Sequence, residues 1–356
     1  MEILYYNEPK SLENGVTNVA CYLSRAIAKK ANLTYFPQFS SRKGALSLFN
    51  VYREYVLRKF DIVHFNIVPT WINGSQIMLK SANRRKTPTV LNVHGLIQLE
   101  HVLEPTLGSL SSFALLDFLT ACNLVDKIVV ATEFLRTKVN AWYGINYDKI
   151  AVIPNGVDFR EFNECERKLA LEGDPAILNI GLIRKIKGFD ILVEAIAKLR
   201  SELPDMKLHI VGHDPSNYSD LVKKRGIEKF VVFHGKVPHL MVPSYLKSAD
   251  ICVFPSRLEG FGIVILEAMA SGVPIVASDI GSFREILSNG KYGMLFKSGN
   301  ANALFEAILG LYQDQGRSKK VATAALEAVK AYSWENIAEK YISLYHSLLV
   351  GSSNTK

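Results

Sequence analysis

The sequence is poor in cysteine and contains no long apolar run. Its four cysteines, Cys21, Cys122, Cys165 and Cys252, lie far apart, with no C-x-x-C pair and no Cys/His cluster. This spacing argues against a disulfide framework or a zinc site and indicates reduced thiols. No stretch approaches about 18 uninterrupted apolar residues, so no membrane-spanning helix is predicted. The first residues lack the basic and apolar regions of a signal peptide, and we therefore expect a cytoplasmic protein.

Several catalytic motifs are also missing. The sequence has no G-x-G-x-x-G after its first predicted strand, no G-x-x-x-x-G-K-[ST], no H-E-x-x-H and no G-x-S-x-G. These absences argue against nicotinamide-dependent dehydrogenases, P-loop nucleotide hydrolases, zinc proteases and α/β-hydrolases. The carboxylate pair D-x-D, which commonly holds a divalent ion against a nucleoside diphosphate, is absent too. Protein groups would have to neutralise any diphosphate, so neither a metal nor another cofactor is expected.

Charge is unevenly distributed in a composition that is otherwise typical of a folded globular protein, with 48% hydrophobic and 21% charged residues. The net charge is +8, and the part through Val157 has 17 basic and 11 acidic residues against 25 and 23 in the remainder. Basic side chains cluster at 58–59 and at Lys80, Arg84, Arg85 and Lys86. Such clusters favour peripheral contact with an anionic membrane, whereas a solvated surface is the alternative. No nucleic-acid partner is expected.

Short β-rich runs alternate with amphipathic segments along the whole chain, which indicates parallel sheets covered by helices. The length of 356 residues predicts two such domains. We expect strands at 2–6, 33–37, 61–65, 89–93, 127–131 and 149–153, and then at 176–181, 208–212, 230–234, 250–255, 274–278 and 293–296. Helices are expected at 15–30, 189–200, 242–247, 262–271 and 301–313, and again from about 316 to 349.

The turn chemistry of Pro154-Asn155-Gly156 separates the two series of strands. We therefore expect a first domain at 1–157 and a second domain at 158–333. No strand follows the last helix, 334–350, which is expected to pack back on the first domain.

The segment from Pro255 to Ala270 is the most informative in the chain. A predicted strand leads into the Gly-rich turn Glu259-Gly260-Phe261-Gly262 and then into a helix. Free amides at the start of a helix, placed at the carboxyl edge of a sheet, form an anion site, and the glycines let a phosphate approach the backbone. Glu267 stands in that helix among apolar or small neighbours. A buried Glu267 would need a partner such as a ribose diol, whereas on a polar stripe it would face solvent.

Glu259 and Glu267 form the pattern E-x7-E around Gly-Phe-Gly, after Pro255-Ser256. This pattern resembles the signature of the retaining GT-B glycosyltransferases, family 4 in particular. The resemblance implies an α/β fold of two doubly wound, Rossmann-like domains that face each other across a cleft. It also implies that a nucleotide-sugar donor binds mainly to the second domain. The backbone positions implied for the donor are Gly260, Phe261, Gly262 and Ile263.

The resemblance extends to the loop from Gly181 to Lys187-Gly188. In the family, a basic residue of this strand-end loop contacts the donor diphosphate, and the resemblance assigns this role to Lys187. A solvated loop lysine is the alternative. The family often has Arg directly after the first glycine, where this sequence has Leu182. Arg184 is then the candidate for the second positive charge.

Two further segments of the second half resemble the family. Phe233-His-Gly-Lys236-Val237 is similar to the wall that contacts the nucleotide base, which implies that the backbone at Lys236 and Val237 reads the base edge. Gly281-Ser282 stands where the family usually has Gly-Gly. Glu285, which follows, is as consistent with a structural helix residue as with a site residue.

The first half matches the family more loosely. Asn14-Gly15-Val16 resembles the Gly-rich loop near the donor phosphates or the acceptor, and a structural turn explains Gly15 almost as well. The run from Asp61 to Asn66 resembles D-x-x-H-x-H, with Asn66 in place of the second histidine. His94 precedes Gly95 at the carboxyl end of a predicted strand, where ligands bind parallel sheets. The resemblance implies that His94 reaches the donor sugar.

The resemblance implies transfer of a sugar from a nucleoside diphosphate to a hydroxyl of a carbohydrate or lipid-linked acceptor, with retention and without an enzyme nucleophile. Glu267 would hold the ribose and Glu259 a sugar hydroxyl, while positive side chains stabilise the leaving diphosphate. The alternatives are a nucleotide-sugar epimerase, a sugar phosphorylase or a non-catalytic subunit of the same fold. The implied catalytic residues are His94, Arg184, Lys187 and Glu259.

Overall fold

The computed structural model describes residues 1–6, 15–36, 59–69, 75–95, 111–166, 169–214 and 218–353. The chain divides into two compact units. Unit 1 consists of Met1–Gly156 and Trp334–Lys356, and unit 2 is Val157–Ser333. The division falls at the Pro154-Asn155-Gly156 turn.

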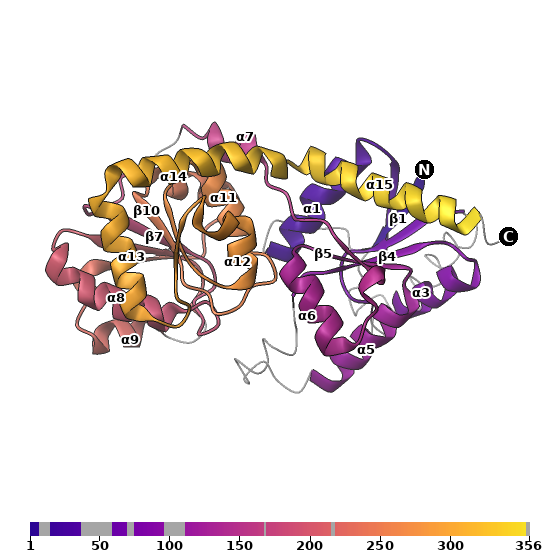
Figure 1. Cartoon of the computed structure of the whole chain (residues 1–356), viewed down its shortest axis with the longest axis horizontal. Coiled ribbons are helices and arrows are strands. Elements are labelled where there is room, and N and C mark those ends of the chain that lie inside the picture. The colour runs from indigo at the N-terminus through magenta and orange to yellow at the C-terminus, as the bar shows by residue number, and fades with distance from the viewer. Residues whose placement is uncertain are drawn as a thin grey trace. The chain divides into compact units, whose positions relative to one another are not determined.

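Unit 1 is built on a parallel sheet with the strand order β2-β1-β3-β4-β5-β6, flanked by helices (Figure 1). The strands are β1 (Glu2–Tyr6), β2 (Asn32–Phe36), β3 (Ile62–Phe65), β4 (Thr89–Val93), β5 (Lys127–Val130) and β6 (Ile150–Val152). The helices are α1 (Gly15–Ala28), α3 (Ser75–Arg84), α5 (Ser111–Leu124), α6 (Glu133–Tyr143) and α15 (Trp334–Ser353).

Local sequence accounts for these elements. The strand β4 reads Thr-Val-Leu-Asn-Val and is buried at every position, as expected for a parallel strand covered on both faces. Helix α6 begins where the Thr132 side chain accepts a hydrogen bond from the Leu135 amide at 3.1 Å. It ends at Gly144, whose φ of 64° is a conformation that glycine adopts without strain.

Helix α15 belongs to unit 1, where it packs beside α1 (Figure 1). Lys29 pairs with Glu335 at 3.1 Å, and Lys30 pairs with Glu339 at 3.0 Å. These pairs are exposed and contribute little. The buried face of α15, which includes Tyr341, supplies most of the attachment because it removes large apolar side chains from water.

Unit 2 has a second parallel sheet with the order β12-β11-β10-β7-β8-β9. Its strands are β7 (Ala176–Ile180), β8 (Lys207–Val211), β9 (Val231–Gly235), β10 (Ile251–Phe254), β11 (Ile275–Ser278) and β12 (Met294–Phe296). Its helices are α7 (Phe159–Asn163), α8 (Phe189–Glu202), α9 (Ser219–Lys224), α10 (Val242–Ser248), α11 (Ile263–Ser271), α12 (Gly281–Ile286), α13 (Ala301–Gln313) and α14 (Gln315–Ala328).

All the strands expected from the sequence are present, and each end lies within one residue of its expected position. The helix expected to start at Gly262 begins at Ile263 instead, because Gly262 has a φ of 95° and precedes the first helical residue. The core of unit 2 is formed where α8 and α13 pack on the sheet, with Leu192, Ile196 and Ile308 fully buried.

Candidate functional site

Glycine marks the ends of three neighbouring strands of unit 2: β9 ends at Gly235, and Gly181 and Gly212 directly follow β7 and β8. The Gly181 amide donates to the Val211 carbonyl, and the Gly212 amide donates to the Gly235 carbonyl, each at 2.9 Å. A Cβ atom on Gly212 would lie 1.7 Å from the Gly181 oxygen, so no other residue fits between these backbones. At these three positions the carboxyl edge of β7, β8 and β9 therefore presents backbone and no side chain.

The loop between β7 and α8 is packed against the segment that follows β10. Gly188 has a φ of 71°, and a Cβ atom there would lie 1.9 Å from the Pro255 oxygen. The Arg257 amide donates to the Ile186 carbonyl at 2.8 Å, and the Arg257 guanidinium pairs with Asp190 at 2.6 Å. These contacts join two parts of the sequence that lie about 70 residues apart.

The same packing brings Lys187 to Glu259. The Lys187 Nζ lies 2.6 Å from Glu259 Oε1, and the Ser256 hydroxyl donates to the same oxygen at 3.0 Å. The side chains are only 35% and 14% exposed, respectively. Lys187 is therefore held in an ion pair and is not a freely solvated loop lysine. Sequence reasoning noted both charges but not their pairing, nor the part that Ser256 takes in it.

Helix α11 begins without a side-chain cap. Gly262 holds the N-cap position in the left-handed region and has no side chain that could hydrogen bond to the first turn. A Cβ atom on Gly262 would lie 2.4 Å from the Phe283 ring, so a larger residue would clash. Uncapped amides at a helix start favour an anion, since the helix dipole is positive there.

Glu267 is buried in α11, with 6% of its surface exposed. Among the residues with described positions, none hydrogen bonds to its carboxyl group. Burial, together with a smaller effect of the negative charge of Glu161 on α7, raises the pKa of Glu267 to about 8. The alternative that Glu267 faces solvent on a polar stripe is thus wrong. The group is mostly protonated at pH 7 when no ligand is bound.

His94 lies in unit 1, immediately after β4. Its Nε2 atom is 2.8 Å from the backbone oxygen of Asn66, which follows β3. A carbonyl oxygen only accepts, so Nε2 carries the proton and Nδ1 keeps its lone pair in the neutral ring. Burial lowers the pKa of His94, which favours this neutral form. Asn66, which stands where the family pattern has a second histidine, therefore orients His94.

The remaining predicted residues occupy the following places. Arg184 is half-buried, three residues before Lys187 in the same loop. After β9, Lys236 is exposed and Val237 is half-buried. Gly15 is the first residue of α1, and Asn14 lies outside the described residues. Unit 2 thus contains most of the predicted site residues, among which an ion pair joins Lys187 to Glu259. These residues are Gly181, Arg184, Lys187, Lys236, Val237, Glu259, Gly260, Phe261, Gly262, Ile263 and Glu267.

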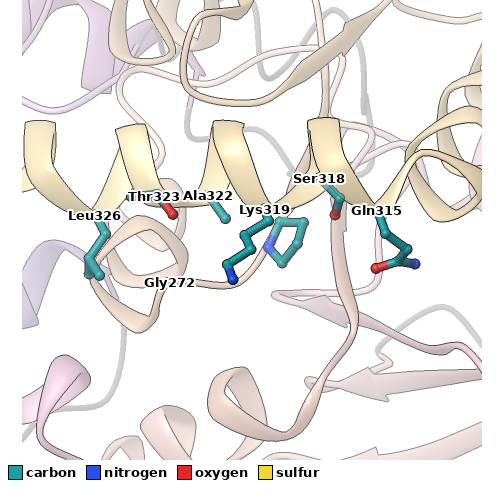
Figure 2. A pocket seen from close by; sticks show the side chains of 8 residues that line it. Gly272, Gln315, Ser318, Lys319, Ala322, Thr323 and Leu326 are labelled. Atoms are coloured by element: carbon teal, nitrogen blue, oxygen red, sulfur yellow. The ribbon is translucent and has the colours of Figure 1, made fainter.

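A pocket of about 270 Å³ lies elsewhere in unit 2, between α14 and the turn that follows α11 (Figure 2). Figure 2 shows Gln315, Ser318 and Lys319 on the α14 side of this pocket. The opposite side includes Gly272, which is the C-terminal cap of α11. None of the predicted site residues lines this pocket, and it is separate from the N-terminal end of α11.

The described part of the chain shows neither a metal-binding cluster nor a membrane-spanning helix. No group of three or more His, Cys, Asp or Glu side chains there is arranged to hold a metal ion. No helix within the same residues combines the length and the apolar composition needed to cross a bilayer.

Solved structures show the class of fold. The chain superposes on sucrose-phosphate synthase from Thermosynechococcus elongatus with a TM-score of 0.80 at 20% identity, covering 98% of this chain and 99% of that one. It also superposes on Anabaena Alr3699/HepE, solved in complex with UDP-glucose, with a TM-score of 0.77 at 18% identity. This superposition covers 98% of this chain and 100% of the HepE chain. Two parallel α/β units of this kind define a GT-B, Rossmann-like fold.

Family models identify the chain more closely. The model for glycosyl transferases group 1 matches residues 161–328, and that for glycosyltransferase family 4 matches residues 8–161. A D-inositol 3-phosphate glycosyltransferase of Arthrobacter is 26% identical over 81% of this chain and 71% of its own length. An uncharacterized glycosyltransferase of Methanocaldococcus jannaschii is 32% identical over 62% of this chain and 59% of its own length. The chain belongs to the group 1, family 4 glycosyltransferases.

Proposed function

We propose that this glycosyltransferase moves a sugar from a nucleoside-diphosphate donor to an acceptor hydroxyl, with retention at the anomeric carbon and without a metal ion. The observation that carries the proposal is the buried carboxyl of Glu267, which has no hydrogen-bond partner among the described residues, in a helix whose first turn has no cap. A ribose diol provides two hydroxyl donors for the ionised carboxylate. A diphosphate provides the negative charge that the helix start favours.

Each site residue then has a specific role. Lys187 and Arg184 face the diphosphate and stabilise the charge that develops as the sugar leaves. Glu259, which holds Lys187 at 2.6 Å, also accepts a hydrogen bond from a sugar hydroxyl. The backbone at Lys236 and Val237 contacts the base. His94 presents the unprotonated Nδ1 to a hydroxyl of the donor sugar.

The donor and the acceptor are proposed by chemical class. A structural neighbour, HepE of Anabaena, is described in complex with UDP and with UDP-glucose. Uridine diphosphate sugars are therefore the first donors to test. The relatives named for inositol 3-phosphate suggest an anionic acceptor.

A lipid-linked acceptor fits the surface of unit 1. Lys80 and Arg84 are exposed on α3, together with Ile77, which is 51% exposed. The neighbouring helix α5 exposes 58% of Leu116. Basic and apolar side chains on adjacent helices are suited to the surface of an anionic membrane, on whose cytoplasmic face this protein would act.

Three other functions make different experimental predictions. A nucleotide-sugar epimerase would convert the donor without an acceptor, and a sugar phosphorylase would require inorganic phosphate. A non-catalytic subunit would consume no donor. The retained Lys187, Glu259 and Glu267 favour an enzyme over such a subunit.

The test is a panel of nucleotide sugars assayed with and without inositol phosphates and glycolipids as acceptors. Proton NMR of the product reads the anomeric configuration. Donor consumption that needs an acceptor and gives the donor's own anomer supports the proposal. Inversion, or turnover of the donor alone to an epimer, contradicts it.

Two variants test the division of roles between the carboxyl groups. Glu267→Ala should weaken binding of the bare nucleoside diphosphate by roughly 1 to 3 kcal/mol, since the ribose loses its partner. Glu259→Ala should lower kcat more than nucleotide affinity, because its ligand is the sugar. Calorimetry with UDP separates these effects. Equal losses of affinity in both variants, or no loss in either, would refute the assigned roles.

A further inference from the structure

We propose that Tyr341, on the C-terminal helix α15, is a positioning residue for His94 and acts on it through Asn92 and Asn66. The inference rests on the proposed role of His94 at the donor sugar. It makes the last helix of the chain part of the machinery of the site, in addition to its packing role in unit 1.

Three hydrogen bonds connect Tyr341 to His94 within unit 1. The Tyr341 hydroxyl donates to Asn92 Oδ1 at 3.0 Å, and Asn92 Nδ2 donates to Asn66 Oδ1 at 3.1 Å. The backbone oxygen of Asn66 then accepts from His94 Nε2 at 2.8 Å. Tyr341, Asn92 and Asn66 are all buried. Hydrogen bonds in such a water-excluded interior hold their geometry, because breaking one leaves a buried polar group without a partner.

Asn66 is the residue through which these hydrogen bonds reach His94. Its side-chain nitrogen is buried without a partner, so Asn92 is the side-chain anchor of its amide. Its backbone amide donates to the Tyr6 carbonyl at 3.3 Å, a long bond that restrains the peptide weakly. Loss of the Asn92 anchor would therefore let the Asn66 carbonyl rotate. That rotation removes the acceptor that keeps the proton of His94 on Nε2.

Tyr345 provides a matched control on the same helix. It lies one turn after Tyr341 and is fully buried, and its hydroxyl lies 2.6 Å from Nδ1 of His64. Within the described part of the chain, it makes no hydrogen bond to Asn92 or Asn66. Its partner His64 does interact with the Asn92 side chain, so Tyr345→Phe shows whether loss of any buried hydroxyl close to Asn92 is enough to change His94. Tyr341→Phe and Tyr345→Phe each remove one buried hydroxyl and keep the ring. The two variants should therefore have similar costs in stability.

The experiment reads His94 directly, by NMR of protein labelled with ¹⁵N-histidine, with the His94 signals assigned by a His94→Gln variant. In the wild type we expect the Nε2–H tautomer alone. Tyr341→Phe should add the Nδ1–H tautomer, while Tyr345→Phe should leave the His94 signals unchanged. Asn92→Ser breaks two of the three bonds and should reproduce the effect. If Tyr341→Phe does not fold, Asn92→Ser is the variant that tests the proposal.

Kinetics provide the second readout. Tyr341→Phe should lower kcat for transfer by roughly five- to tenfold, with the affinity for UDP unchanged. Unaltered His94 signals in both Tyr341→Phe and Asn92→Ser, or equal changes in the Tyr341 and Tyr345 variants, would overturn the proposal. A wild type that transfers no sugar would overturn the proposed function instead, and the NMR signals would still decide whether Tyr341 positions His94.

Discussion

Replacement of Glu267 by glutamine is expected to stabilise the protein at neutral and alkaline pH and at the same time to weaken nucleotide binding. Glutamine keeps the size and one oxygen acceptor of the protonated carboxyl group but cannot ionise. In the wild type, the buried carboxyl must either remain protonated or carry a charge away from water, next to the charge of Glu161. The substitution removes this cost.

The size of the effect follows from the pKa. A change from the ordinary value of 4.5 to about 8 in the folded protein corresponds to up to roughly 5 kcal/mol, at about 1.4 kcal/mol for each pH unit. Between these two values the folded state binds more protons than the unfolded state, so the stability of the wild type falls as pH rises. The advantage of Glu267→Gln should therefore be near zero below pH 4.5, about 3 kcal/mol at pH 7 and largest above pH 8.

The assay is chemical unfolding of both proteins between pH 5 and about pH 9, followed by a signal from unit 2. Only the difference in the free energy of unfolding between the two proteins is used, because the contributions of the other titrating groups are the same in both and cancel. Glu306→Gln, which removes an exposed carboxyl group from α13, is the control for a change of charge alone. If the gain in the free energy of unfolding of Glu267→Gln over the wild type does not change with pH, the reasoning is refuted.

Binding provides the complementary measurement. A ribose diol that binds the ionised carboxylate must displace the proton, so UDP binding near pH 7 should release protons in the wild type. Calorimetry in buffers of different ionisation enthalpy measures this release. It should disappear in Glu267→Gln, together with part of the affinity.

Two further outcomes are expected. Turnover should survive EDTA, since helix amides and Lys187 face the roughly two negative charges of the diphosphate, and a loss of activity that added Mg²⁺ or Mn²⁺ restores would count against this. Anionic vesicles should sediment the wild type at low salt, less so as salt shortens the Debye length, and should not sediment a variant with Arg84, Arg85 and Lys86 all changed to Glu. Charge reversal at 223–224 in unit 2 is the matched control. If the wild type stays in the supernatant at low salt, membrane contact is contradicted and a soluble acceptor is expected.

The sequence alone determined the strands, several of the helices and the division into two series of strands. Parallel strands covered on both faces are mostly apolar, and the turns between them favour glycine, proline or asparagine, so these signals are local. For the same reason, the residues Glu259-Gly260-Phe261-Gly262 were sufficient to predict the uncapped start of α11. Only the exact first helical residue differed, because the positive φ of Gly262 is a property of the folded turn.

Tertiary structure alone decided how the site residues are paired and protonated. Lys187 meets Glu259 across 72 positions of sequence, and Tyr341 meets Asn92 across 249. Neither contact leaves a periodic signal in the chain, since each depends on how distant elements pack. The same holds for Glu267: its sequence neighbours allowed either a buried or an exposed carboxyl group. Packing of α7 and of the sheet on α11 removed water from that side chain and raised its pKa.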